Sequence, residues 1–112
     1  MLFVTLCTAR PGASEAAMKR RLGWRVPKGS RIVAEFWLPT MDPRVVIAME
    51  TDDPATIFEG QSEWDDIYEM KTFPAVTGEY GLQMARAMLA EHGAATPKRA
   101  KATPATRTPV GV

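Results

Sequence analysis

Two neighbouring segments decide the fold: Arg31-Ile-Val-Ala-Glu-Phe-Trp-Leu38 and Arg44-Val-Val-Ile-Ala-Met-Glu-Thr51. Both are rich in the β-branched and aromatic residues that favour extended strands. The residues between them, Pro39-Thr-Met-Asp-Pro43, are mostly turn formers. Together these segments predict a β-hairpin in the middle of the chain.

Five further segments complete the predicted order of elements. Ser14 followed by Glu15 indicates one helix start, and Asp52-Asp53-Pro54 indicates a second. An Asp cap accepts backbone N–H groups, and proline suits the first turn because no N–H is needed there. We expect strands over residues 2–8 and 67–76, a helix from Ser14 to Gly23, a helix following Pro54, and a helix over 80–91.

The predicted helices have apolar sides. Met18 and Leu22 share a face of the first helix at i, i+4, and Ile57, Phe58 and Trp64 give the second its apolar side. The full order is strand, helix, strand, strand, helix, strand, helix. It predicts an α+β domain of ferredoxin-like βαββαβ(α) topology, with a four-stranded antiparallel sheet and helices on one face.

Length and charge set the domain organisation. The chain has 112 residues and a net charge of +1, which divides into −3 over residues 1–92 and +4 over residues 93–112. We expect one domain over 1–92 and a disordered, basic, Pro/Thr/Ala-rich tail over 93–112. The mildly acidic domain argues against nucleic-acid binding except for weak contacts of the tail. A domain this small would cover a leftover apolar face economically as a homodimer.

The single cysteine and the hydropathy pattern indicate a compartment. Cys7 has no cysteine partner and lies in a predicted strand, so a buried, inert thiol in a reducing environment is expected. Residues 2–6 are apolar but too few for a secretory signal, and no segment reaches transmembrane length. We therefore expect a cytoplasmic protein that does not contact membranes.

The hairpin also predicts a site. If the turn pairs Pro39 with Arg44, Glu35 lies opposite Ala48. The face toward the helices then carries Ile32, Ala34, Phe36, Leu38, Val45, Ile47 and Met49. The opposite face, turned toward a partner subunit, then carries the candidate catalytic residues Glu35 and Glu50 and the candidate pocket residues Trp37, Arg31 and Arg44.

Two interpretations of the candidate carboxylates stay open. Glu35 and Glu50 would be diagonal neighbours with Cβ atoms roughly 7–8 Å apart, so that one pKa rises and yields a general acid or base. Alternatively, Arg31 and Arg44 pair with them in a structural ion network, which is the commoner arrangement.

No metal site or cofactor is predicted. His92, the only histidine, falls at the end of the last predicted helix, where a cation complements the helix dipole. Asp52 and Asp53 serve as helix caps, with no supporting cluster of metal-ligand residues at a recognisable spacing. Haem is disfavoured because His92 lies outside the predicted cleft, although haem and flavin are not strictly excluded.

Three segments resemble sequence blocks of a bacterial family called domain of unknown function 3303: Gly29 to Trp37, Met49 to Asp53, and Trp64 to Pro74. The likeness covers roughly residues 1–90. It implies a subunit of a dimeric α/β barrel, a superfamily that includes cofactor-independent monooxygenases, lactone isomerases and haem-degrading enzymes. Fold kinship of this kind does not carry function with it.

The chain departs from that family at the second strand. The family's usual Trp-His pair is Phe36-Trp37 here, so a proton-shuttling or metal-binding histidine is missing, and Glu35 replaces an expected basic or small polar residue. Enzyme activity is therefore left open. We expect a small dimeric α/β-barrel protein that binds or transforms a small, partly aromatic or carbonyl-containing metabolite between the sheet and a partner subunit. The alternative is a non-catalytic homodimeric interaction protein.

Overall fold

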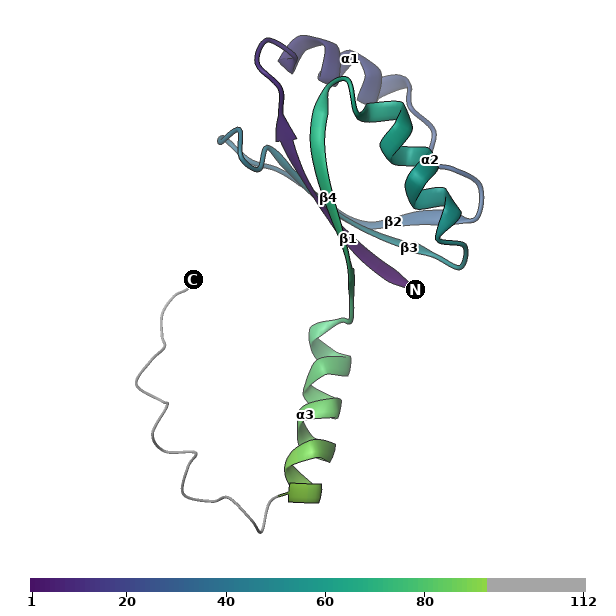
Figure 1. Ribbon diagram of the computed structural model, residues 1–112, viewed down its shortest axis with the longest axis vertical. Helices are drawn as coiled ribbons and strands as arrows, with labels where there is room; N and C mark the ends of the chain where they lie inside the picture. Colours follow the sequence, from purple (N-terminus) through teal and green to yellow (C-terminus); the bar gives the residue numbers. More distant parts are fainter. Residues whose placement is uncertain (93–112) are drawn as a thin grey trace. The chain divides into compact units, whose positions relative to one another are not determined.

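A single antiparallel sheet organises the computed structural model, which describes residues 1–92 (Figure 1). Its strands are arranged in the spatial order β2-β3-β1-β4, and all neighbouring strands pair antiparallel. The elements along the chain are β1 (Leu2–Ala9), α1 (Ser14–Gly23), β2 (Ser30–Trp37), β3 (Val45–Thr51), α2 (Ala55–Trp64), β4 (Tyr68–Ala75) and α3 (Gly78–His92). This is the predicted ferredoxin-like α+β fold.

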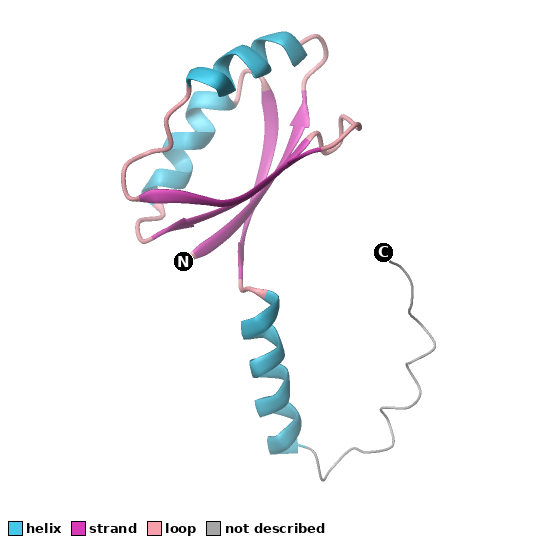
Figure 2. Ribbon diagram, turned by 180° about the vertical axis from the view of Figure 1, so that it is seen from behind, coloured by secondary structure: helices cyan, strands magenta, loops and turns pink. Residues whose placement is uncertain are grey.

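The chain divides into two units after Val76. The first unit holds the sheet with α1 and α2, and both helices cover the same face of the sheet (Figure 2). The second unit begins at Thr77 and contains α3. The predicted tail over 93–112 lies outside the described residues.

The start of α2 follows the predicted cap. An Oδ1 of Asp53 accepts the backbone N–H of Ala55 at 3.0 Å, and the backbone carbonyl of Asp53 accepts the N–H of Thr56 at 3.0 Å. The hydroxyl of Thr51 lies 2.9 Å from that of Thr56, which ties the end of β3 to the first turn of α2. The Asp-Asp-Pro signal therefore places the helix correctly.

The core of the first unit lies between the helices and one end of the sheet. Ala17 of α1, Trp64 of α2 and Ile67 are its buried centre, and Trp24 and Tyr68 pack against them. The ring of Trp64 meets Trp24 edge-on at 5.6 Å and stacks with Tyr68 at 5.8 Å between ring centroids. Such aromatic pairs contribute about 0.5–1.5 kcal/mol each beyond the area that they bury.

The predicted register of the hairpin is wrong by one residue. Leu38, not Pro39, pairs with Arg44, because the Leu38 N–H donates to the Arg44 carbonyl at 2.8 Å and proline has no N–H to donate. Glu35 therefore lies opposite Ile47, and Phe36 opposite Val46. The face toward the helices receives Glu35 and Trp37 instead of Ala34 and Phe36.

A β-bulge at Val33 breaks the alternation of β2. Ile32 pairs with Met49 and Ala34 pairs with Ala48, so that Val33 has no residue opposite it. Ile32 consequently shares the face of Met49, as predicted, whereas the residues after the bulge are reversed. Phe36 is 60 % exposed on the face away from the helices.

The predicted helix faces are also partly wrong. In α1 the buried residue is Ala17, whereas Met18 is exposed and Leu22 is 87 % exposed. In α2 the side chain of Trp64 is buried, but Phe58 is 71 % exposed. The small side chain of Ala17 packs in the core with Trp64 and Ile67 instead.

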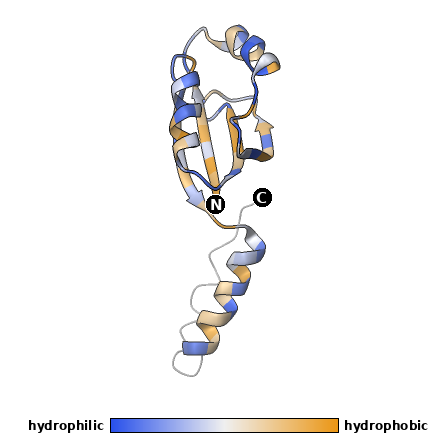
Figure 3. Cartoon of the chain, turned by 90° about the vertical axis from the view of Figure 1, so that its right-hand side faces the viewer, coloured by the Kyte–Doolittle hydropathy of each residue, from blue (hydrophilic) through white to orange (hydrophobic). Residues whose placement is uncertain are grey.

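Helix α3 spans Gly78–His92 and carries no buried residue. Its apolar side chains, among them Leu82 and Leu89, are exposed, and apolar and polar residues are interspersed along it (Figure 3). Within residues 1–92, no helix combines the length and the apolar character needed to cross a membrane.

Candidate ligand-binding site

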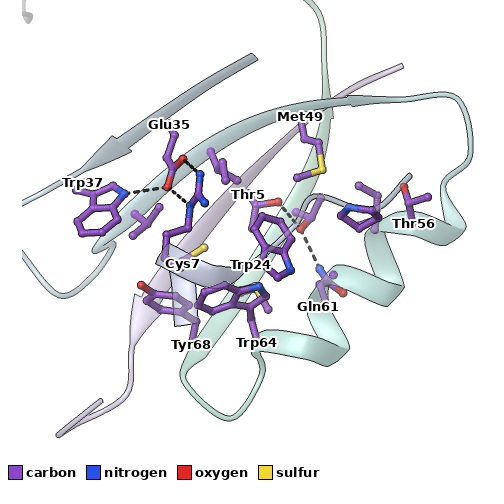
Figure 4. A pocket seen from close by; sticks show the side chains of 18 residues that line it. Thr5, Cys7, Trp24, Glu35, Trp37, Met49, Thr56, Gln61, Trp64 and Tyr68 are labelled. Carbon is purple, nitrogen blue, oxygen red and sulfur yellow. Dashed lines mark hydrogen bonds and ion pairs between the residues drawn. The ribbon is translucent and has the colours of Figure 1, made fainter. Parts of the chain in front are cut away.

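A cavity of ≈ 80 Å³ lies between the sheet and the two helices that cover it (Figure 4). Alternate residues of each strand reach it, as expected for one face of a pleated sheet. The two central strands contribute Thr5, Cys7, Val45, Ile47 and Met49. The edge strands contribute Glu35, Trp37, Tyr68, Met70 and Thr72.

Helix α2 supplies the opposite wall. Ile57, Gly60, Gln61 and Trp64 line the cavity at the i, i+3, i+4, i+7 spacing of a single helix face. A Cβ atom added at Gly60 would meet no atom within 4 Å, so the missing side chain leaves open space. The glycine that weakens the helix therefore contributes to the cavity volume.

The aromatic lining is concentrated in one place. The chain has three tryptophans, Trp24, Trp37 and Trp64, and all three line the cavity. The indole N–H of Trp24 donates to Glu63 at 2.9 Å, which fixes that ring although it lies in a loop after α1. The cavity wall is therefore mostly apolar, and a hydrogen bond holds the Trp24 ring in it.

An ion pair occupies one end of the cavity. Arg21 of α1 donates through Nε and Nη2 to the two carboxylate oxygens of Glu35, at 2.9 and 2.8 Å. The indole N–H of Trp37 donates to the same carboxylate at 2.9 Å. An open depression of ≈ 420 Å³ on the outer side is bounded by Arg21, Leu22, Glu35 and Trp37. Arg21, Glu35 and Trp37 thus line both the inner cavity and this depression.

The electrostatics of the pair keep both groups ionised. The hydrogen bonds from Arg21 hold the pKa of the Glu35 carboxyl below its ordinary value, against a smaller opposing effect of burial. The same pairing raises the pKa of Arg21. A general base or acid working near neutral pH would need a raised carboxyl pKa, so the proton-carrier role predicted for Glu35 has no support in its surroundings.

Polar groups of a different kind lie among the strands. The hydroxyls of Thr5 and Thr72 are 2.8 Å apart, and Gln61 Nε2 donates to Thr72 Oγ1 at 2.9 Å.

Burial raises the pKa of the Cys7 thiol to about 12, with a further rise from the charge of Glu35. Burial also raises the pKa of Tyr68. Cys7 and Tyr68 are therefore neutral at physiological pH.

Comparison with known proteins gives a family. The model of a family described as "Domain of unknown function (DUF3303)" matches residues 1–92. The chain belongs to the DUF3303 family. No curated protein and no solved structure matches it.

The predicted site residues of this DUF3303 protein separate onto two faces. Glu35 and Trp37 line the cavity, whereas Glu50 lies on the opposite face of the sheet, next to Arg31 at 3.3 Å and the N-terminal amine at 3.8 Å. Arg44 does not line the cavity. The two carboxylates are therefore not neighbours, and the ion network that was the alternative exists in another form, as Arg21–Glu35 and Arg31–Glu50.

His92 and Asp53 lie where their structural interpretations placed them. Asp52 does not: it makes no capping hydrogen bond within residues 1–92, and its exposed carboxylate lies 4.0 Å from the N-terminal amine. His92 is in the last turn of α3, where its Nδ1 is 3.0 Å from the Met88 carbonyl oxygen. Asp53 caps α2. Among residues 1–92 of the DUF3303 chain, no three His, Cys, Asp or Glu side chains are grouped so as to hold a metal ion.

Sequence reasoning missed Arg21, Thr5, Thr72 and Gln61. Arg21 lies four residues after the buried Ala17, so the i, i+4 spacing would have placed it on the inner face of α1 if Ala17 had been taken as its centre. Thr5 and Thr72 are 67 residues apart in the sequence. Nothing local indicates that their hydroxyls meet in this DUF3303 protein.

Proposed function

We propose that the protein binds a small, mostly apolar molecule in the cavity between the sheet and helices α1 and α2. The observation that supports this proposal is a partly open cavity with all three tryptophans in its wall and one ion pair at one end. Apolar walls with a few positioned polar groups are typical of ligand sites. A volume of ≈ 80 Å³ suits a ligand, or a buried part of one, of a few non-hydrogen atoms.

Titration with pentane tests this proposal. The three indole N–H signals in a two-dimensional ¹H–¹⁵N NMR spectrum of the ¹⁵N-labelled protein report on the cavity without an attached probe, because each tryptophan lines it. We expect saturable shifts of these signals with a dissociation constant of about 0.1 mM, which lies below the solubility of pentane in water and corresponds to about 5.5 kcal/mol of binding free energy. The absence of saturable shifts would contradict the proposal.

The substitution Gly60→Leu should block the cavity in a protein that still folds. The new side chain enters the open space at Gly60, and replacing glycine inside a helix stabilises it by up to about 1 kcal/mol. We expect at least a tenfold loss of pentane affinity. The matched control is Glu59→Leu on the exposed side of α2, which should leave the affinity unchanged.

A second candidate function is homodimerisation through the sheet face that the helices leave open. Two rows of mostly apolar residues cross all four strands of this face, Phe36-Val46-Leu6-Lys71 and Ala34-Ala48-Val4-Phe73. Phe36 and Phe73 are 60 % and 51 % exposed. A two-fold arrangement would place this surface against its own copy, and stable dimers typically bury about 800 Å² on each partner.

Sedimentation analysis at several concentrations tests the dimer. We expect the wild-type chain to sediment as a dimer, and Phe73→Glu to sediment as a monomer because the new charge would be buried without a partner. Phe58→Glu on α2 is the control, since Phe58 is even more exposed than Phe73, at 71 % against 51 %, but lies in the helical layer. A wild-type protein that stays monomeric at about 0.5 mM would rule out this candidate.

A further inference from the structure

The proposed cavity contains a hydroxyl hydrogen with no acceptor in the described part of the chain. A threonine hydroxyl carries one hydrogen and can accept two hydrogen bonds. Gln61 Nε2 donates to Thr72 Oγ1, and one of the two hydroxyls of Thr5 and Thr72 donates to the other. The second hydroxyl hydrogen has no acceptor among residues 1–92. The Thr5–Thr72 pair can therefore donate one hydrogen bond to a molecule in the cavity.

The ionised groups of the lining neutralise each other. Arg21 uses two of its five N–H groups on Glu35, and the pair as a whole has no net charge to offer a charged ligand. The Glu35 carboxylate already accepts three hydrogen bonds, two from Arg21 and one from Trp37. A ligand carboxylate or ammonium would have to break this arrangement or enter the apolar wall without a counter-ion, and both are costly. The cavity therefore selects an uncharged ligand with a hydrogen-bond acceptor.

We propose that the ligand is a small aliphatic carbonyl compound whose oxygen accepts the hydrogen bond offered by the Thr5–Thr72 pair. This inference rests on the proposed ligand-binding function and names the chemical class that the site takes. The apolar chain of the ligand lies along the tryptophans. A ligand whose alkyl chain is too large for the cavity of ≈ 80 Å³ extends past Arg21 and Glu35 into the outer depression.

A comparison of 2-pentanone with pentane tests the proposal, because the two probes differ by one carbonyl oxygen. Both are titrated by NMR into the wild-type protein and into Thr5→Val/Gln61→Leu/Thr72→Val, which has no polar group at this place. The cost of dehydrating each probe cancels between the two proteins. In the triple variant the buried ketone oxygen has no hydrogen-bond donor, and leaving a buried acceptor unpaired costs more than a hydrogen bond normally contributes. We therefore expect the affinity ratio of ketone to alkane to fall about tenfold in the triple variant.

Controls separate the possible outcomes. Thr8→Val changes a threonine of the same strand whose hydroxyl donates to Asp42 away from the cavity, and it should leave the ratio unchanged. Pentanoate should bind the wild-type protein at least tenfold more weakly than 2-pentanone, and equal binding would refute selection of an uncharged ligand. If neither pentane nor 2-pentanone binds, the proposed function itself fails. If both bind and their ratio is the same in the triple variant, only the carbonyl inference fails.

A measurement on the wild-type protein covers the case in which the triple variant does not fold. The C=O stretching frequency of bound 2-pentanone, recorded by infrared difference spectroscopy, should be lower than that of the same ketone dissolved in an alkane, because hydrogen bonding weakens the C=O bond. A bound ketone with the alkane frequency would overturn the proposal.

Discussion

Replacing Trp64 with alanine should lower the free energy of unfolding by about 3–5 kcal/mol. Trp64 is 7 % exposed at the centre of the core and contacts the rings of Trp24 and Tyr68. Truncating a buried tryptophan removes its transfer free energy and leaves a cavity that the surroundings fill only partly. The whole free energy of unfolding of a native protein is about 5–15 kcal/mol. Urea unfolding followed by circular dichroism should therefore show a much lower midpoint urea concentration for the variant.

Phe58→Ala is the matched control for this substitution. Phe58 lies on the same helix but is 71 % exposed, so its truncation should change the unfolding free energy by no more than about 0.5 kcal/mol. If Trp64→Ala also cost less than about 1 kcal/mol, the aromatic cluster would not be the core of the domain.

Replacing Arg21 with methionine should lower the free energy of unfolding by about 1–3 kcal/mol. Methionine keeps most of the apolar packing of the side chain, but Glu35 is then left half-buried with only the Trp37 N–H as a partner. The expected loss lies between that for exposed ion pairs, below about 1 kcal/mol, and that for fully buried pairs, about 3–5 kcal/mol. Lys19→Met, which breaks the exposed Lys19–Glu15 pair on the same helix, should cost about 0.5 kcal/mol or less.

The pH dependence gives an independent measure of the Arg21–Glu35 pair. The pKa of Glu35 is lowered in the folded chain, so the unfolded chain takes up a proton first as the pH falls. The stabilisation by the pair is fully present above pH 4.5, the ordinary carboxyl value, and is lost as the pH falls below it toward the folded pKa. The difference in unfolding free energy between wild type and Glu35→Gln should therefore be largest near pH 7 and smaller at pH 3. A difference that grows on acidification would contradict the assignment.

The local signals in the sequence were sufficient for the elements of this fold. The hairpin, the Asp53 cap of α2 and the core position of Trp64 depend on residues close together in the chain, and each is confirmed. The order of the elements then determined the ferredoxin-like class. Side-chain direction was less predictable, because it depends on where pairing begins and on contacts between distant segments.

The candidate site shows most clearly that the elements were predictable and the directions of their side chains were not. Glu35 and Trp37 were rightly grouped as neighbours, but a one-residue register error placed them on the wrong face of the sheet. The inner face of α1 could not be predicted from its hydropathy because Arg21 is directed inward by a carboxylate 14 residues away. An ion pair of this kind outweighs the apolar preference of Leu22, which is left in contact with water.

The unpaired Val33 also determines how other DUF3303 sequences should be compared with this one. Because β2 changes phase there, an alignment that scores uninterrupted alternation along the strand will assign its second half to the wrong side. Loss or gain of a single residue near position 33 would turn Glu35 and Trp37 away from the interior without changing any chemical group. Relatives that differ in length at this point should accordingly differ in what their interior can hold, even where the side chains themselves are identical.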